Sequence, residues 1–222
     1  DDLNDWVGSL QGHPQARTPN IDQLASRGVI FTNAHTAAPA CNPSRVSLMT
    51  GLLPTSSGVY SNSKPWRPVL ADAVTLPQYF MAHGYNALGA GKIYDNRFPD
   101  PDSWNDYFPS QTKNKPDDPM PDNRPVNGIP NTRLLDWGPL DVDEADMGDA
   151  KVADWVIQQL GQQHEKPFFL ASGFFRPHLP WHVPRAYFDH YPLDSVQLPE
   201  NPVNDLEDIP PAGIAMANPE GD

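Results

Sequence analysis

Residues 149–172, DAKVADWVIQQLGQQHEKPFFLAS, join a helical pattern to a continuous apolar run. Apolar residues between Val152 and Leu160 recur at the spacing of one helix face, which predicts a helix over residues 149–163. The run at 167–172 is typical of a strand that is buried on both faces of a sheet. A helix followed by a buried strand indicates a layered α/β fold.

The same order of helix and strand occurs twice earlier in the chain. Residues 18–25 predict a helix, and the Val-Ile-Phe run at 29–31 predicts the strand that follows it. Residues 75–81 predict a second helix, which is followed by a predicted strand at 85–88. In α/β sheets, functional sites collect in the loops beyond the strand ends, and we expect the site there.

Length and composition favour one large folded domain and exclude a nucleic-acid partner. The 222 residues can form a sizeable core, and a formal charge of -13 lacks the basic footprint that phosphate backbones require. A focused local site can still bind an anion. The single cysteine excludes an internal disulfide framework, and the lack of a long apolar run predicts no membrane span.

The 27 prolines predict long, stiff loops. Residues 98–138 are rich in proline and aspartate with scattered aromatic residues. We expect this stretch to be a structured insertion that borders the active-site pocket.

The only cysteine lies at the predicted start of a helix, in the string Cys41-Asn42-Pro43-Ser44-Arg45. Pro43 suits the first helical turn, so free N–H groups and the helix dipole next to Cys41 favour an anion. Arg45 lies one turn along on the same face. The spacing excludes the C-x5-R loop of cysteine phosphatases, and a lone cysteine excludes a dithiol redox motif. A buried structural thiol is the remaining alternative to a reactive residue.

The string at 41–45, with Thr-Gly in register at 50–51, resembles the C-x-P-S-R signature of type I sulfatases. The Asp-Asp-Leu at 1–3 is similar to the aspartate pair of that family, and the Gly-Lys at 91–92 is similar to its lysine motif. The Arg-Pro-His-Leu-Pro block at 176–180 resembles the branch that contains iduronate-2-sulfatases and bacterial polysaccharide sulfatases.

The resemblance implies the alkaline-phosphatase-like sulfatase fold, an α/β fold with a mixed β-sheet sandwiched between helices. Residues 1–222 are expected to form the N-terminal part of this catalytic domain. The family takes its remaining metal ligands from a later Asp-His or Asp-Asn block, and no such block follows His190. We therefore expect an incomplete fold that alone binds metal poorly and turns over slowly.

The resemblance also implies a chemistry. A separate formylglycine-generating enzyme would oxidise Cys41 to formylglycine (3-oxoalanine), whose hydrate attacks the sulfur of a sulfate ester and then releases sulfate. Arg45 would hold the formylglycine, and Lys92 would bind a sulfate oxygen. His178 would contact the sulfate and protonate the leaving oxygen.

A divalent cation belongs to the implied site. Asp1 and Asp2 are the expected ligands, together with an oxygen of the modified Cys41. Paired carboxylates suit a hard ion, so calcium is the expected metal. A solvated pair of acidic residues is the alternative interpretation of Asp1 and Asp2.

The implied substrate is a sulfated carbohydrate. Trp66 would offer a stacking face to the sugar and Arg67 would offer a cation, with core packing of Trp66 as the alternative. Because sulfated polysaccharides are extracellular, we expect the protein to be periplasmic or secreted.

One position departs from the branch pattern. The lysine motif usually places a histidine three residues after the lysine, and Asp95 stands there instead. A carboxylate would repel sulfate, so lowered or altered activity is expected. Two other functions stay open: hydrolysis of phosphate mono- or diesters by the same nucleophile, and binding of sulfated glycans by an impaired homologue. The histidines other than His178 are interpreted as structural or surface residues, and His182, which lies beside His178 in the sequence, is the first of them to consider as an exception.

Overall fold

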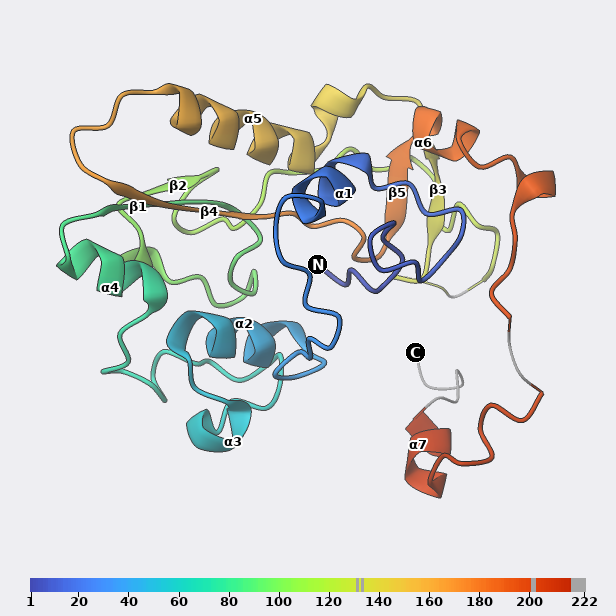
Figure 1. The fold of residues 1–222 in the computed structure, drawn as a ribbon, viewed down its shortest axis with the longest axis horizontal. Helices are drawn as coiled ribbons and strands as arrows, with labels where there is room; N and C mark the ends of the chain where they lie inside the picture. The colour runs from blue at the N-terminus through green and yellow to red at the C-terminus, as the bar shows by residue number, and fades with distance from the viewer. Residues whose placement is uncertain (131, 133, 201–202, 217–222) are drawn as a thin grey trace.

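The computed structural model describes residues 1–130, 132, 134–200 and 203–216. Its main sheet has three parallel strands in the order β2-β1-β4. The strands are β1 (Asn86–Gly91), β2 (Asp106–Phe108) and β4 (Phe168–Gly173). Helix α5 (Gly148–Gly161) covers one face of this sheet and helix α4 (Leu76–Ala82) covers the other (Figure 1). The expected α/β class, a sheet between helices, is confirmed.

The central strand β1 is reached through a well-defined helix end. Thr75 and Gln78 form a capping box at the start of α4, in which Thr75 N donates to Gln78 Oε1 at 2.9 Å. Gly84 has a φ of 85° and turns the chain from α4 into β1. The register then runs from Asn86 opposite Phe168 along the whole length of β4.

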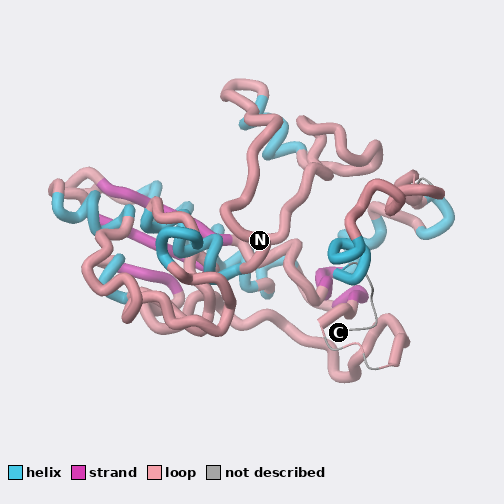
Figure 2. Tube along the Cα trace, turned by 90° about the horizontal axis from the view of Figure 1, so that it is seen from below, coloured by secondary structure: helices cyan, strands magenta, loops and turns pink. Residues whose placement is uncertain are grey.

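A second, smaller sheet pairs β3 (Trp137–Leu140) with β5 (Trp181–Pro184) in parallel. Figure 2 shows the two groups of strands lying apart, with the chain start between them. The proline-rich stretch at 98–138 supplies β2 to the main sheet and the first residues of β3 to the small one. It is therefore built into both sheets, while its expected position at the border of the pocket stays a prediction.

Short helices and turns complete the described chain. None of the helices in the described ranges is long and apolar enough to cross a membrane. The remaining elements are α1 (Pro19–Ala25), α2 (Cys41–Thr50), α3 (Pro54–Ser57), η1 (Pro101–Ser103), η2 (Glu144–Asp146), α6 (Arg185–Asp189), η3 (Leu193–Ser195) and α7 (Pro211–Met216).

The core lies between α2 and the α4 face of the main sheet. Trp66 is 1% exposed and stacks on Tyr94, with ring centroids 5.5 Å apart. Val46 and Met49 bring α2 onto this cluster. The packing fixes the α2 axis relative to the end of β1, so it also fixes the residues that each element carries there.

The strand predicted at 29–31 is wrong. These residues form no strand, and Val29 and Phe31 are 81% and 77% exposed. Both sides of β1 are already paired, by β2 and β4, and no described strand lies alongside 29–31. An apolar run predicts a strand only when a neighbouring strand is present to accept its hydrogen bonds.

Two glycines bring the ends of β1 and β4 together. Gly91 has a φ of 78°, and a Cβ there would lie 2.1 Å from the Gly173 carbonyl oxygen. A Cβ on Gly173 would lie 2.2 Å from the Lys92 carbonyl oxygen. Only residues without a side chain allow this approach, and it directs the chain at Lys92 toward the start of α2.

Candidate active site

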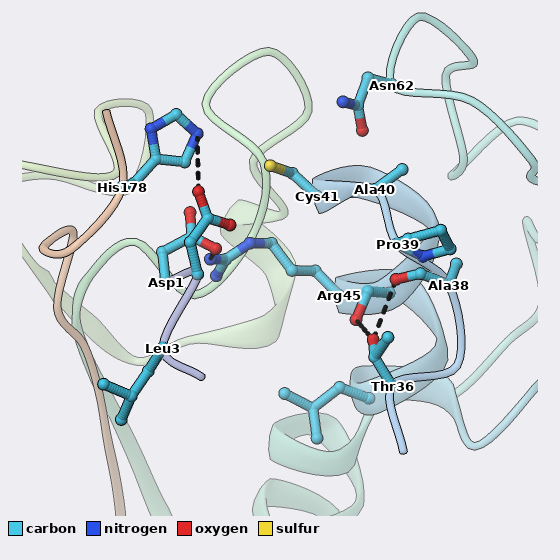
Figure 3. A pocket seen from close by; sticks show the side chains of 13 residues that line it. Asp1, Leu3, Thr36, Ala38, Pro39, Ala40, Cys41, Arg45, Asn62 and His178 are labelled. Carbon is cyan, nitrogen blue, oxygen red and sulfur yellow. Dashed lines mark hydrogen bonds and ion pairs between the residues drawn. The ribbon is translucent and has the colours of Figure 1, made fainter. Parts of the chain in front are cut away.

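Cys41 is the first residue of α2, at the floor of an open cavity of about 640 Å³. Ala40 precedes the helix in extended conformation, and Gly51 ends it with a φ of 73°. The predicted placement of Cys41 at a helix start is thus confirmed. One wall of the cavity comprises Asp1, Leu3 and His178, and the opposite wall comprises Thr36, Ala38, Pro39, Ala40 and Asn62 (Figure 3). Asp2 also lines the cavity, with Oδ2 3.9 Å from His178 Nε2, and the wall with these two carboxylates is called the carboxylate wall.

Arg45 extends from the second turn of α2 beneath the cavity. Its Nη1 donates to the carbonyl oxygens of Lys92 and Ile93, the latter at 2.9 Å, and its Nη2 lies 3.0 Å from Asp1 Oδ1. The side chain is 14% exposed. Burial lowers the pKa of Arg45, but an arginine keeps its charge at any physiological pH. Arg45 therefore ties α2 to the end of β1 and places a positive charge under Cys41.

Lys92 lies at the point where β1 ends, as the sequence predicted. Its Nζ forms an ion pair with Asp1 and lies 3.9 Å from Cys41 Sγ. The ammonium also faces the Phe175 ring, 4.8 Å from the centroid. Burial is the main cause that lowers the pKa of Lys92. The structure therefore places a buried cation, paired with Asp1, beside the cysteine.

His178 reaches the cavity from the loop that follows β4. Its Nδ1 lies 2.6 Å from the Leu179 carbonyl oxygen, so Nδ1 carries the proton in the neutral ring. Nε2 lies 3.9 Å from Asp2 Oδ2. Burial, with the nearby Lys92 charge, lowers the pKa of His178 below its ordinary value.

Three of the expected site residues form a possible metal-binding group. Ligand atoms of Asp1, Cys41 and His178 all lie within 4.8 Å of one another. Asp2 lines the same cavity but is 56% exposed and stands outside this group. The expected pair of carboxylates is therefore unequal: Asp1 faces Cys41, and Asp2 lies toward the solvent side.

Asp95 lies behind the site and is bound by Arg97. Its Oδ1 accepts hydrogen bonds from the backbone N and the Nε of Arg97, both at 3.0 Å, and its Oδ2 accepts one from Nη2 at 3.4 Å. Burial alone would raise the pKa of Asp95, but these hydrogen bonds outweigh it and lower the pKa. The carboxylate stays ionised and is paired within two residues.

Trp66 and Arg67 do not line the cavity. Trp66 is a core residue whose Nε1 donates to the Phe98 carbonyl oxygen at 3.2 Å. Arg67 forms an ion pair with Asp100 and donates to the Ala73 carbonyl oxygen at 2.8 Å. The expected stacking face and cation for a sugar are used inside the protein, which is the core alternative that the sequence left open.

His182 is a structural residue. It is completely buried, and its Nε2 lies 3.0 Å from Asp136 Oδ2. Asp136 is the residue before β3 in the small sheet, and its Oδ1 also accepts a hydrogen bond from the backbone N–H of Asn127 at 3.0 Å. The pair joins β5 to the segment before β3, away from the cavity lining, so the structural interpretation of His182 is confirmed and this residue is no exception.

Sequence reasoning missed the wall opposite the carboxylates. Thr36 Oγ1 lies 3.0 Å from Ser44 Oγ and donates to the Ala38 carbonyl oxygen at 2.9 Å, which holds the approach to α2 against the helix. Asn62 lines the same wall from a loop 20 residues beyond Asn42. No local motif marks either residue, because only the folded chain brings them beside Cys41.

The fold is similar to that of a solved structure. A phosphonate monoester hydrolase of Agrobacterium radiobacter superimposes with a TM-score of 0.62 at 23% identity, over 87% of this chain and 42% of that chain. The likeness places the chain in the alkaline-phosphatase-like fold class.

Sequence comparison identifies the family. The sulfatase family model matches residues 1–207. A sulfatase of Formosa agariphila is 36% identical over 97% of this chain and 45% of its own length. The human iduronate 2-sulfatase is 34% identical over 91% of this chain and 38% of its own length. The chain belongs to the sulfatase family, and it spans less than half the length of these curated relatives.

Proposed function

We propose that this protein is a sulfuric ester hydrolase that removes sulfate from a sulfated carbohydrate, with a nucleophile derived from Cys41. The observation that carries the proposal is the cavity in which Cys41 Sγ lies 3.9 Å from Lys92 Nζ and beside the Asp1 and His178 side chains. Membership of the sulfatase family supports the reaction. The name of the iduronate 2-sulfatase relative supports a sulfated sugar as substrate.

Formylglycine, made from Cys41 by a formylglycine-generating enzyme, would supply two hydroxyls on one carbon: one to attack sulfur and one to expel sulfate. The start of α2 favours negative charge at this position, because free backbone N–H groups and the helix dipole point toward it. Arg45 adds a charge that is held in place by two backbone carbonyls.

Lys92 and His178 would bind the sulfate from two sides. Lys92 Nζ already lies near the cysteine sulfur and can donate to a sulfate oxygen. In His178 the Nδ1–H is used by the Leu179 carbonyl, so Nε2 is the atom that would pass a proton to the leaving oxygen. Only the protonated ring can do so, and its lowered pKa makes that proton easy to release.

A calcium ion fits the carboxylate wall. Asp1 and Asp2 offer the oxygen donors that calcium prefers, and both line the cavity beside Cys41. We assign the His178 nitrogen to sulfate, because calcium binds oxygen ligands. Arg45 and Lys92 now neutralise Asp1, so a cation bound there competes with them for the same oxygens. When bound, calcium would polarise the sulfate oxygens.

Mass spectrometry tests the nucleophile. The protein is co-expressed with a formylglycine-generating enzyme, and the tryptic peptide that contains Cys41 is expected to show the mass decrease of a thiol converted to an aldehyde. An unmodified thiol from a converting host overturns the proposal.

Parallel assays with aryl sulfate and aryl phosphate esters then test the reaction. Faster turnover of the sulfate ester, lost in Cys41→Ala, supports sulfatase activity. Faster turnover of the phosphate ester supports the phosphoesterase alternative. Modification without turnover of either ester supports a glycan-binding homologue.

A further inference from the structure

The two walls of the cavity differ in charge. Asp1 and His178 lie on one wall, with Arg45 beneath them, and Asp2 lines the cavity next to His178. The other wall carries no charged side chain among the described lining residues, and Asn62 is its largest polar group (Figure 3). Cys41 lies between the two walls. A sulfate ester has the same asymmetry, an anionic sulfate on one side of the scissile bond and a neutral alcohol on the other.

The carboxamide of Asn62 has a defined orientation. The backbone N–H of Asn42, in the first turn of α2, donates to Asn62 Oδ1 at 2.8 Å. An acceptor must face that N–H, so the oxygen points to the helix and the NH2 group points away from it. Asn62 Nδ2 makes no hydrogen bond to any residue within the described part of the chain, and the side chain borders the cavity.

The loop that carries Asn62 is anchored independently of the Asn62 side chain. Asn42 is 1% exposed, and its Nδ2 donates to the carbonyl oxygens of Ser61 at 3.1 Å and Lys64 at 2.8 Å. These bonds hold the backbone on both sides of Asn62. The free NH2 group is therefore presented from a fixed position, which lowers the entropy lost when a ligand binds it.

We propose that Asn62 Nδ2 donates a hydrogen bond to an oxygen of the sugar, a hydroxyl or ring oxygen next to the scissile ester, and so selects sugar sulfates over simple aryl sulfates. The inference rests on the proposed sulfatase function. A neutral donor suits this role, because a sugar oxygen is uncharged and accepts hydrogen bonds from an amide. An aryl sulfate has a ring without such an oxygen and cannot use the contact.

Asn62→Asp separates recognition from structure. The carboxylate still accepts the Asn42 N–H, and it lies near the positive end of α2, so folding is expected to be unchanged. The substitution removes only the donor and adds a negative charge. That charge repels the sulfate of every substrate equally, so the ratio of kcat/KM values for a sulfated monosaccharide and an aryl sulfate cancels the repulsion.

The assay uses a panel of monosaccharide sulfates and one aryl sulfate with the formylglycine-containing protein. We expect the sugar-to-aryl ratio of kcat/KM to fall about tenfold in Asn62→Asp, the size of one lost hydrogen bond to substrate, with the unfolding temperature unchanged. Ser63→Ala is the matched control, because among the described residues the Ser63 hydroxyl hydrogen-bonds only to Ser61 Oγ, at 3.1 Å, and the ratio for this variant is expected to equal that of the wild type.

The outcomes distinguish the two proposals. The assays use a protein of the relatives' full length that contains this chain, and a wild type of that length that hydrolyses neither ester overturns the sulfatase function itself. A wild type that hydrolyses aryl sulfate but no sugar sulfate overturns the carbohydrate substrate of the proposed function, and the role of Asn62 with it. An Asn62→Asp ratio equal to that of the wild type overturns the role of Asn62 alone. Asn62→Ala, which also removes the acceptor for Asn42 N–H, is expected to lower the unfolding temperature as well as the ratio.

Discussion

Replacement of Arg45 by methionine tests whether the Arg45 side chain stabilises the fold by connecting α2 to the end of β1 and to Asp1. Methionine keeps most of the length and apolar stem of arginine but removes the charge and all five donors. The change leaves the carbonyl oxygens of Lys92 and Ile93 without their donor, and it leaves Asp1 with one cation instead of two. These groups come from α2, from the end of β1 and from the chain start.

The expected loss follows from burial. The Arg45 and Asp1 side chains are 14% and 11% exposed, so removal of Arg45 takes the donor from two buried carbonyls and takes one of two cations from a buried carboxylate. Breaking such a buried pair costs about 3–5 kcal/mol. Lys92 still neutralises Asp1, which places the expected value near the lower end, about 3 kcal/mol. A domain of ordinary stability would lose a large part of its free energy of unfolding.

Urea denaturation followed by tryptophan fluorescence measures this loss, since Trp66 and Trp104 are buried and report core exposure. Arg185→Met is the matched control. Arg185 forms an ion pair with Asp141 in which both side chains are more than half exposed, so solvent screens the pair and its loss should cost far less than the loss of Arg45. If the free energy of unfolding fell by the same small amount in both variants, the stabilising role of Arg45 would be refuted.

Three further predictions concern the core and the cation. Burial raises the pKa of Tyr94 to about 12 from an ordinary value of 10.0, so the neutral phenol stabilises the fold fully below pH 10 and progressively less as the pH rises toward 12. In urea melts at a series of pH values, Tyr94→Phe should show a smaller loss of stability at alkaline pH than the wild type. At neutral pH the variant should lose about 1 kcal/mol, because the hydrogen bond between Tyr94 and Ser103 is absent. Trp66→Ala should lower the free energy of unfolding by about 3–5 kcal/mol in the same melts, whereas Trp6→Ala, at a site that is 43% exposed, should lower it by about 1 kcal/mol. A similar small loss for both variants would contradict the core role of Trp66 and favour the alternative of a sugar-stacking residue. Calcium at about 100-fold above its Kd should stabilise the wild type by about 2.7 kcal/mol in thermal melts and should not stabilise Asp1→Asn. The control variant Asp141→Asn should respond like the wild type. A response of Asp1→Asn equal to that of the wild type would show that Asp1 is not a calcium ligand.

Local sequence signals predicted the elements that carry the site. Pro43 in the first turn and Gly51 at the end bound α2, and Gly84 marks the passage from α4 to β1. The periodic apolar residues of 149–163 correspond to α5. These signals act through backbone conformation and one helix face, within a few residues, so they can be read without the rest of the fold.

Pairings between distant residues could not be predicted in the same way. Lys92 and Asp1 are 91 residues apart, and their ion pair follows from the glycine contact between β1 and β4. Trp66 is a second example of a role that the sequence alone does not decide. A tryptophan beside an arginine reads equally well as a sugar platform or as core, and only its stack on Tyr94 decides between them.

Asp95 illustrates how the structure changes an electrostatic argument made from sequence. A carboxylate three residues after Lys92 suggests repulsion of the sulfate, and that reasoning assumes a free charge. Arg97 instead satisfies both carboxylate oxygens, and Asn114 Nδ2 donates to the Asp95 carbonyl oxygen at 2.9 Å, which fixes the turn. A paired carboxylate acts on a substrate as a dipole, whose field falls faster with distance than that of a charge. Arg45 and Lys92, the cations beside Cys41, share the single partner Asp1, so the side chains of these three residues together carry one net positive charge next to the cysteine, although the chain as a whole carries a charge of -13.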